Sequence, residues 1–290
     1  MRRRRTQPTP KSPADIEKMR RAAGVVEDVL TMVAEQIGPG VKTSDLNRQA
    51  EEMIAAVDGR PLFKGYEGGP GVQPFPYALC VSLNDVVVHG FPSDRPLEEG
   101  DIVSVDCGVE LDGWCGDFAY TFPIGAISEE KTALLRATKQ SLYEGIARAV
   151  VGNRVGDIGH AVQTYCESRG YGVVTALVGH GLGQSLHEPP QVPNVGRRGN
   201  GKRLRDGYTI CIEPMINAGT PEVTVDADGW TIRTADRKPA AHFEHTVHVR
   251  RGQPAELLSS YDRIEAALAK NRGETVDQLP TALGDLAVLS

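Results

Sequence analysis

Apolar residues recur at helical spacing near the start of the chain and predict two helices there. The first helix begins at Ser12-Pro13, because serine caps helix N-termini and proline suits the first helical turn. It ends before Gly38-Pro39-Gly40, and the second helix runs over residues 45–57. Strand-like apolar runs follow at 78–83, 86–89, 102–109 and 114–122.

The same order of elements returns in the second half of the chain. Ser128 caps a predicted helix that runs to about Val151, and another predicted helix covers residues 157–169. Predicted strands follow at 173–178, 208–216, 231–234 and 242–249. We therefore predict an α+β domain of two pseudo-symmetric αα-ββ halves, whose strands share one sheet with helices over a face.

Both ends of the chain depart from this pattern. Residues 1–12 are predicted to be a disordered tail, basic at Arg2 to Arg5 and then proline-rich, without the apolar segment of a signal peptide. The alternative is a docking arm for an anionic or SH3-like partner. Residues 252–290 are predicted to form a peripheral, partly helical tail, which leaves one domain over residues 13–251.

The composition is typical of a globular protein, with 40% hydrophobic and 24% charged residues in a chain of 290. The sequence contains no apolar run of the length that a transmembrane helix needs. The five cysteines form no Cys-x-x-Cys pair, which favours a reducing, cytoplasmic location over a disulfide framework. Residues 1–21 carry eight basic and two acidic side chains, so the net charge of −6 leaves −12 on the rest. An acidic body argues against a general nucleic-acid binder.

Two aspartates, Asp106 and Asp117, lie in predicted strands, where aspartate is uncommon. The chain turns between them within residues 110–113. A four-residue loop would place Asp106 opposite Asp117, whereas a two-residue loop at Asp112-Gly113 would pair Asp106 with Ala119 and leave Asp117 diagonal on the same face. Either register brings two carboxylates together, and burial would then require a proton or a cation. The alternative is an exposed, polar face.

Two glutamates lie in predicted strands of the second half. Glu213 precedes Pro214, which cannot donate to a strand ladder and so favours a strand end or edge. Glu244 shares a face with His242 by the period of two, whereas His245 points to the opposite face. We therefore predict that His245 has a structural role or supports a ligand from behind, rather than joining Glu244 at one site.

Three histidines complete the candidate set. His180 lies in the glycine-rich segment Gly179 to Gly183, which leaves the backbone free to direct the imidazole inward. His187 and His89 lie in or beside turns, and each histidine alone is typical of a turn or a core. Two Asp, two Glu and one His together are the donor set of a carboxylate-rich dinuclear centre, in which two divalent ions activate a hydroxide.

In combination these motifs resemble those of the type I methionine aminopeptidases, metallopeptidases of family M24 with the pita-bread fold. The resemblance covers about residues 14–250 and rests on Asp106-x10-Asp117, Gly179-His-Gly-Leu-Gly183, Ile212-Glu-Pro-Met215 and Phe243-Glu-His-Thr246. It implies a central, mainly antiparallel sheet and two divalent metal ions (Co, Mn, Fe or Zn). Asp117 and Glu244 would bridge the ions, Asp106 would chelate one of them, and the other would be held by His180 and Glu213.

The resemblance also implies an activity. The enzyme would remove the N-terminal methionine from nascent proteins and peptides whose second residue is small, by attack of a metal-activated hydroxide on the methionine carbonyl. Glu213 would shuttle the proton, and His89 and His187 would donate hydrogen bonds to the peptide and the developing oxyanion. The implied binding residues for the methionine side chain are Tyr66, Cys80, Leu186 and Trp230.

The chain departs from the family pattern around this pocket. Residues 67–76 resemble an insertion, which leaves open whether Phe75 or Tyr77 faces the methionine side chain. Phe63 stands where a small residue or cysteine is common, and Leu186 where an aromatic residue is common. We expect the segment from 65 to 76 to alter substrate access.

Related enzymes and an inactive relative are the alternatives. Prolidases share the five ligands but carry an extra N-terminal domain, for which the residues before Asp106 leave no room. Type II methionine aminopeptidases carry a helical insertion that the interval from His187 to Glu213 cannot hold. An inactive peptide-binding or ribosome-associated relative would lose ligands, and all five are present here.

The expected partners are nascent polypeptide N-termini. We expect a monomer that binds no membrane, and Arg2 to Arg5 are the candidate contact to the ribosome, because ribosomal RNA is an anionic partner.

Overall fold

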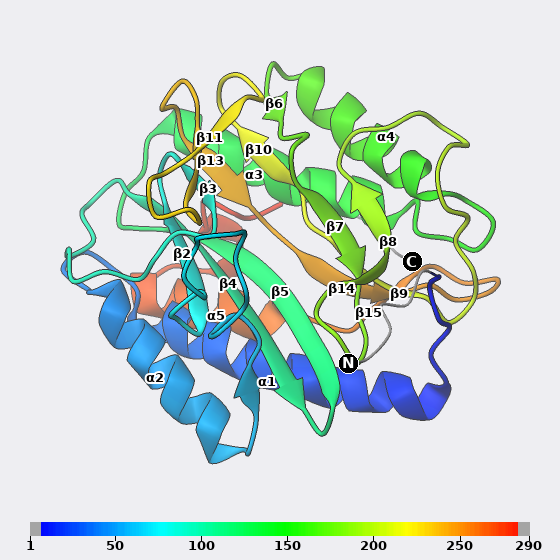
Figure 1. Ribbon diagram of the computed structural model, residues 1–290. Coiled ribbons are helices and arrows are strands. Elements are labelled where there is room, and N and C mark those ends of the chain that lie inside the picture. Colours follow the sequence, from blue (N-terminus) through cyan, green and yellow to red (C-terminus); the bar gives the residue numbers. More distant parts are fainter. Residues whose placement is uncertain (1–6, 284–290) are drawn as a thin grey trace.

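The computed structural model describes residues 7–283, in which helices pack outside antiparallel sheets (Figure 1). The helices are α1 (Pro13–Gln36), α2 (Thr43–Ala56), α3 (Glu129–Ile146), α4 (Val155–Glu167), α5 (Asp262–Arg272) and the short 3-10 helix η1 (Val276–Gln278). Helix α1 packs on the strands of the first half, and α3 and α4 pack on those of the second half. The two predicted helix pairs are therefore present, one over the strands of each half. No helix within residues 7–283 is long and apolar enough to cross a membrane.

The strands form four hydrogen-bonded sheets. The first joins β1 (Arg60–Pro61), β4 (Ile102–Leu111), β2 (Leu79–Leu83) and β5 (Trp114–Pro123). The second joins β15 (Glu256–Leu257), β14 (His245–His248), β9 (Thr209–Ile212), β7 (Val178–Gly181) and β8 (Glu188–Pro193). The third joins β13 (Ala240–His242), β10 (Met215–Asn217) and β6 (Gly172–Val173), and the fourth joins β11 (Val223–Val225), β12 (Ile232–Thr234) and β3 (Val86–Val88).

Two predicted strands are interrupted at their glutamates. The run 208–216 becomes β9 and β10 with Glu213-Pro214 between them, and the run 242–249 is divided between β13 and β14 by Phe243-Glu244. Pro214 has no N–H for a ladder, and the Glu244 N–H donates to the Ala119 carbonyl of β5 at 3.1 Å. The expectation that these glutamates lie within strands is therefore wrong, whereas the strand end that Pro214 favours is present, because β9 ends at Ile212. Both glutamates lie where the chain passes from one sheet to another.

Two other predicted boundaries are also wrong. Helix α3 ends at Ile146 rather than near Val151, because the backbone tightens into i to i+3 hydrogen bonds at Arg148 and Ala149. The run 173–178 contains only the end of β6 and the first residue of β7.

The β4–β5 hairpin decides the register of the two aspartates. Its turn is the two-residue loop Asp112-Gly113, and both residues have positive φ, 51° and 78°. Positive φ at both central positions is the requirement of the type I′ turn, which matches the twist of a hairpin. Asp106 consequently pairs with Ala119 and Asp117 with Gly108, so the two-residue alternative is confirmed.

Hydroxyl groups join the two halves along β5. This strand pairs with β4 at one edge only, and its other edge faces β13 and β14. The Thr121 hydroxyl donates to the His242 carbonyl at 2.6 Å and accepts from the His242 N–H at 3.1 Å. The Thr246 hydroxyl donates to the Asp117 carbonyl at 2.6 Å. Side-chain hydroxyls thus take the place of a backbone ladder where the predicted single sheet is divided.

Helix α1 positions the strand that carries Asp117. Ser12 and Asp15 form a capping box at the start of the helix, as the serine and proline there predict. Ala22 and Ala23 lie fully buried against β5 at Gly116, where a Cβ atom would approach the Ala23 backbone nitrogen to 2.3 Å. Only glycine therefore allows this contact, directly beside Asp117.

The N-terminal segment differs from the predicted disorder over residues 7–12. The Lys11 N–H donates to the Gly207 carbonyl at 2.7 Å, and its ammonium pairs with the Glu188 carboxylate at 2.7 Å. These two side chains are only 5% and 8% exposed. Residues 7–12 are thus packed on the body, and the rest of the predicted tail, residues 1–6, lies outside the described residues.

The C-terminal segment is not peripheral, contrary to the prediction. Ile264 and Leu268 of α5 are fully buried, and α5 packs against α1. Tyr261, just before α5, is 3% exposed and lies in the core. The segment from 252 to 283 therefore completes the hydrophobic core of the domain.

Candidate active site

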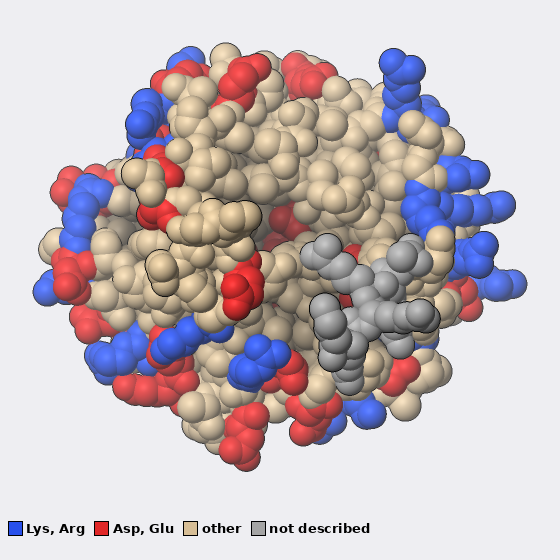
Figure 2. Space-filling view, viewed as in Figure 1, with Lys and Arg blue, Asp and Glu red and all other residues tan. Residues whose placement is uncertain are grey.

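A single cavity brings together the residues predicted to carry function. It has a volume of about 300 Å³, and Figure 2 shows acidic atoms at the bottom of a hollow on this face. The predicted residues among its lining are Tyr66, Cys80, His89, Asp106, Asp117, His180, Leu186, His187, Glu213, Trp230 and Glu244. The lining therefore includes every predicted site residue, although they come from distant parts of the sequence.

Four carboxylates reach the cavity, each from a different position in the fold. Asp106 lies on β4 and Asp117 on β5, whereas Glu213 and Glu244 lie at the breaks between strands. Asp117 and Glu244 are only 3% and 2% exposed. The strand breaks explain the position of the glutamates, because a residue that leaves a ladder can direct its side chain along the sheet edge.

Burial raises the pKa of each carboxyl group. Loss of hydration raises the pKa of Asp106 to about 7. It also raises the pKa of Asp117 well above its ordinary value, and repulsion from Glu244 and Asp106 adds to the shift. The pKa values of Glu213 and Glu244 are raised in the same way, by burial first and by neighbouring carboxylates second. The ionised forms are therefore unfavourable without a nearby cation.

Several carboxylate oxygens of the cavity have no hydrogen-bond partner among the described residues and lie close to His180. Asp106 Oδ1, Asp117 Oδ1 and Glu244 Oε1 are buried without a hydrogen-bond partner among the described residues. His180 Nε2 lies 3.7 Å from Asp117 Oδ2 and 3.5 Å from Glu213 Oε1. Burial lowers the pKa of His180 to about 3, so the imidazole is a neutral donor of a lone pair rather than a counter-ion. This donor set fits divalent metal ions.

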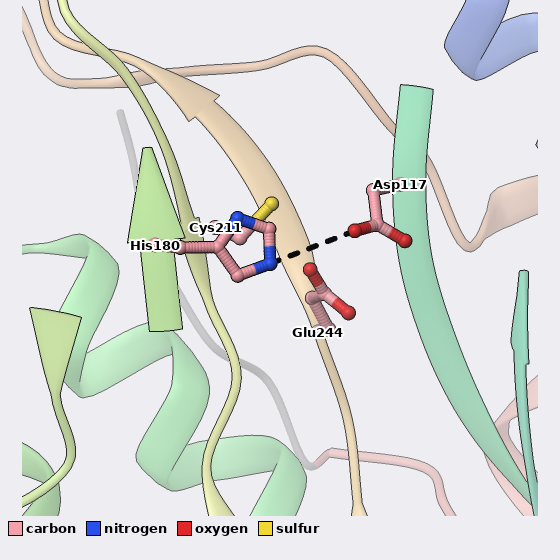
Figure 3. A group of neighbouring side chains, drawn as sticks. All are labelled: Asp117, His180, Cys211 and Glu244. Atoms are coloured by element: carbon pink, nitrogen blue, oxygen red, sulfur yellow. Dashed lines mark ion pairs between the residues drawn. The ribbon is translucent and has the colours of Figure 1, made fainter. Parts of the chain in front are cut away.

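Figure 3 shows how part of this set converges. His180 from β7, Asp117 from β5 and Glu244 point toward one another, with Cys211 from β9 beside them. One ligand atom from each of the four residues lies within 4.8 Å of those of the others. We did not predict Cys211 as part of this group, although it lies only two residues before Glu213 in the sequence.

Two histidines and a tyrosine stand at the wall of the cavity. The Tyr66 hydroxyl lies 2.7 Å from His187 Nδ1, and the His187 ring meets the His180 ring edge-on at 4.4 Å between centroids. His89 has a positive φ of 58°, which directs its side chain away from the course of β3. Burial lowers the pKa of His89 to about 4, so this imidazole is also neutral.

Aromatic residues form an apolar part of the cavity wall next to Tyr66 and His89. Of the two residues between which the sequence left a choice, Phe75 lines the cavity and is 2% exposed, and Tyr77 is not among the lining residues. Trp230 packs edge-on against Phe75 at 5.4 Å, and its indole N–H donates to the Gln73 carbonyl at 2.8 Å. Phe63 also lines this wall. The segment 67–76 therefore contributes directly to the pocket.

Two further histidines behave as their strand positions indicate. His242 lines the cavity, on the face that it was expected to share with Glu244. His245 points away, with its Nδ1 2.8 Å from the Ser259 hydroxyl, and it is fully buried. The prediction that His245 points away from Glu244's site is confirmed.

Comparisons with known proteins agree with this geometry. The sequence profile of metallopeptidase family M24 matches residues 17–251. A methionine aminopeptidase of Clostridium acetobutylicum is 47% identical over 250 residues, which cover 86% of this chain and 97% of the relative. The crystal structure of methionine aminopeptidase from Thermotoga maritima superimposes with a TM-score of 0.83 at 41% identity, and the match covers 88% of this chain and all of that one.

More distant structures share the fold alone. The prolidase of Pyrococcus furiosus has a TM-score of 0.68 at 19% identity, and this chain covers 65% of it. The likeness to methionine aminopeptidases is closer in both sequence and structure and extends over nearly their full length. The predicted resemblance is confirmed, and the chain belongs to metallopeptidase family M24.

Proposed function

We propose that this chain is a metal-dependent aminopeptidase that removes the N-terminal methionine from polypeptides. The observation that carries the proposal is the group of buried, unpartnered carboxylates beside His180 at the bottom of a cavity with an apolar wall. The relatives that the chain matches over nearly their whole length are named methionine aminopeptidases. Nascent polypeptide N-termini in the cytoplasm are the proposed substrates.

The proposed metal ligands are Asp106, Asp117, His180, Glu213 and Glu244. Four carboxylates would balance the charge of two divalent ions, which the unpartnered oxygens and raised pKa values favour. Bound ions would supply an activated hydroxide and would polarise the scissile carbonyl. Cobalt, manganese, iron and zinc all accept this donor set, so the proposal covers all of them.

Among the polar groups of the cavity, Glu213 would transfer the proton, and two histidines would donate hydrogen bonds to the peptide. Glu213 lies at the cavity and carries a raised pKa, which suits a group that accepts a proton and returns it to the leaving amine. The Tyr66 hydroxyl lies 2.7 Å from His187 Nδ1, and in the tautomer in which the hydroxyl donates to Nδ1, the His187 Nε2–H is free to donate to the substrate carbonyl. His89 is the second donor, because its neutral imidazole retains one N–H.

The apolar wall accounts for the methionine side chain. Phe75, Cys80, Leu186 and Trp230 present aromatic, thiol and aliphatic surface, which suits an unbranched, polarizable thioether. A charged or polar first residue would lose hydration there without gaining a partner. We propose that the second residue must be small, as in the family that the sequence resembles.

A peptidase assay with defined metal content tests the proposal. The chelator-treated chain should be inactive on Met-Ala-Ser and should regain methionine release with Co, Mn, Fe or Zn at controlled occupancy. Leu-Ala-Ser and Met-Leu-Ser should be poor substrates. Glu213→Gln should lower kcat at least about a hundredfold, whereas Glu167→Gln, an exposed position on α4, should not. Activity that resists the chelator, or none with any ion, would overturn the proposal.

Other expectations stay predictions. The proposed ribosome contact through Arg2 to Arg5 lies outside the described residues. The monomeric state also stays a prediction, which sedimentation of the purified chain would check.

A further inference from the structure

Tyr261 connects the C-terminal segment to the candidate metal centre. It lies just before α5 and beyond residues 17–251, which the family profile matches. Its hydroxyl lies 2.7 Å from the Ala119 carbonyl and 2.7 Å from the Glu244 carbonyl, and it accepts the Glu244 N–H at 3.0 Å. A single buried hydroxyl thus contacts both polar groups of the Glu244 backbone and the backbone of β5.

The Tyr261 hydroxyl bonds to Glu244 at a point where the Glu244 backbone belongs to no strand and has no ladder hydrogen bonds. Glu244 lies between β13 and β14, so its backbone groups depend on partners from elsewhere in the fold. β5 is unpaired at this edge, and its Ala119 carbonyl is the other partner of the Glu244 N–H. Ala119 and Asp117 are two residues apart and share a face of β5. Tyr261 therefore ties the backbone that carries Glu244 to the strand that carries Asp117.

The packing of the ring determines where the hydroxyl lies. The Tyr261 ring stacks on His245 at 3.9 Å between centroids and meets Tyr120 edge-on at 4.9 Å. The residue is 3% exposed, so few other rotamers are open to it. A hydroxyl that is fixed in this way can set the position of the Glu244 backbone rather than follow it.

We propose that Tyr261 is a positioning residue for the metal centre, which holds Glu244 at the distance from Asp117 that metal binding requires. The inference rests on the proposed function, since it needs Asp117 and Glu244 to be ligands. It gives the C-terminal segment a role in positioning a metal ligand, in addition to its part in the hydrophobic core.

Tyr261→Phe removes the hydroxyl and keeps the ring, and Tyr120→Phe is its matched control. The Tyr120 hydroxyl is also buried and bonds to Thr281 at 2.6 Å and to Glu265 at 3.0 Å, without any bond to Glu244. Both variants lose a buried hydroxyl, so both should unfold at lower denaturant concentration. Only Tyr261→Phe should bind Co²⁺ more weakly, by about tenfold or more, in calorimetric titration of the metal-free chain. Its Co²⁺ absorption spectrum should also differ from that of the wild type.

The outcomes separate positioning from simple stabilisation. Equal Co²⁺ affinity in the wild type and Tyr261→Phe, or an equal loss in Tyr120→Phe, would overturn the inference and leave the proposed function intact. A wild-type chain that binds no Co²⁺, Mn²⁺, Fe²⁺ or Zn²⁺ would overturn both.

Hydrogen exchange of the wild type keeps the inference testable if Tyr261→Phe does not fold. Metal binding should slow amide exchange in residues 240–248 and in residues 256–262 together, because Tyr261 links them. Protection of the first segment alone would contradict the link.

Discussion

The acidic residues of the cavity owe their raised pKa values mainly to burial rather than to their residue type. At an exposed position Asp117 would be ionised and hydrated at neutral pH. Within the cavity it is 3% exposed, and lost hydration together with Glu244 and Asp106 raises its pKa well above the ordinary value. The metal-free fold is therefore less stable than the same fold with a bound cation, because a ligand that binds only the native state stabilises it.

Asp117→Asn should stabilise the metal-free chain. A carboxyl group whose folded pKa is raised favours unfolding once the pH exceeds its unfolded pKa, and asparagine keeps the shape without the charge. With a chelator at pH 8, we expect a free energy of unfolding about 1–3 kcal/mol above that of the wild type by urea titration. Added Co²⁺ should reverse the order, because only the wild type retains the ligand. A metal-free variant less stable than the wild type would contradict the electrostatic account.

His89 should make stability depend on pH in a defined window. Its folded pKa is about 4 and its ordinary value 6.5, so on acidification the unfolded chain takes up a proton before the folded chain does. The free energy of unfolding should therefore fall as the pH drops from 6.5 toward 4, by at most about 1.4 kcal/mol per pH unit from this group. His89→Asn tolerates the positive φ and does not titrate, so its urea midpoint should fall less steeply. Parallel curves for the metal-free proteins would exclude this role.

At the scale of elements, the β4–β5 hairpin and α1 decide where Asp106 and Asp117 lie. The type I′ turn at Asp112-Gly113 sets the register, and the close contact of α1 at Gly116 holds β5 against the helix. The strand breaks at Glu213 and Glu244 then bring the two glutamates to the same cavity. The geometry of the site thus depends on the turn and the strand breaks as much as on the strands and helices themselves.

Gly116→Ala tests the contact between α1 and β5. Its Cβ would approach the Ala23 backbone nitrogen to 2.3 Å, so the helix must shift and the free energy of unfolding should fall by about 1–3 kcal/mol or more. Gly24→Ala on the same helix is the control, because nothing lies within 4 Å of its Cβ and alanine favours helix, so it should be neutral or stabilising. Chemical denaturation measures both, and equal effects would show that the α1–β5 contact is not tight.

At the scale of the whole molecule, segments outside the repeated halves complete the site. The N-terminal segment reaches the start of β8, directly after His187, through the pair of Lys11 and Glu188, and the C-terminal segment reaches Glu244 through Tyr261. The N-terminal segment was predicted to be a tail because its sequence is polar and proline-rich, and the C-terminal one because its sequence turns polar after the helical pattern of Ile264 and Leu268. Those two side chains are nevertheless buried, and single buried contacts of Lys11 and Tyr261 join both segments to the body.

Lys11→Met should destabilise the protein by leaving the Glu188 carboxylate buried without its cation. The expected loss in the free energy of unfolding is about 1–3 kcal/mol. Adding Glu188→Gln should restore part of it, because the amide carries no charge and its oxygen still accepts the Gln184 N–H. A double-mutant cycle by urea unfolding measures the coupling, and additive losses would show that the pair does not interact.

The features of the fold and site that could be predicted are those encoded within a short segment of the sequence. Helix periodicity, the Ser12 cap and the β4–β5 turn residues are local, and α1, α2 and the hairpin followed from them. The predicted site residues could also be named, because acids in apolar runs and histidines among glycines are visible in the sequence and resemble a family pattern. Cys211 was missed, since a cysteine in an apolar run is equally typical of a core.

The sequence by itself therefore determined the two αα-ββ halves and the set of residues that the cavity collects, because backbone propensity and residue chemistry are properties of short segments. Only the tertiary structure decided the strand break at Glu244, which of Phe75 and Tyr77 lines the cavity, and the place of both terminal segments. Each of these depends on which residues compete for a buried hydrogen bond or a buried surface across the fold. That competition is settled between segments that are distant in sequence, so no local pattern contains its result.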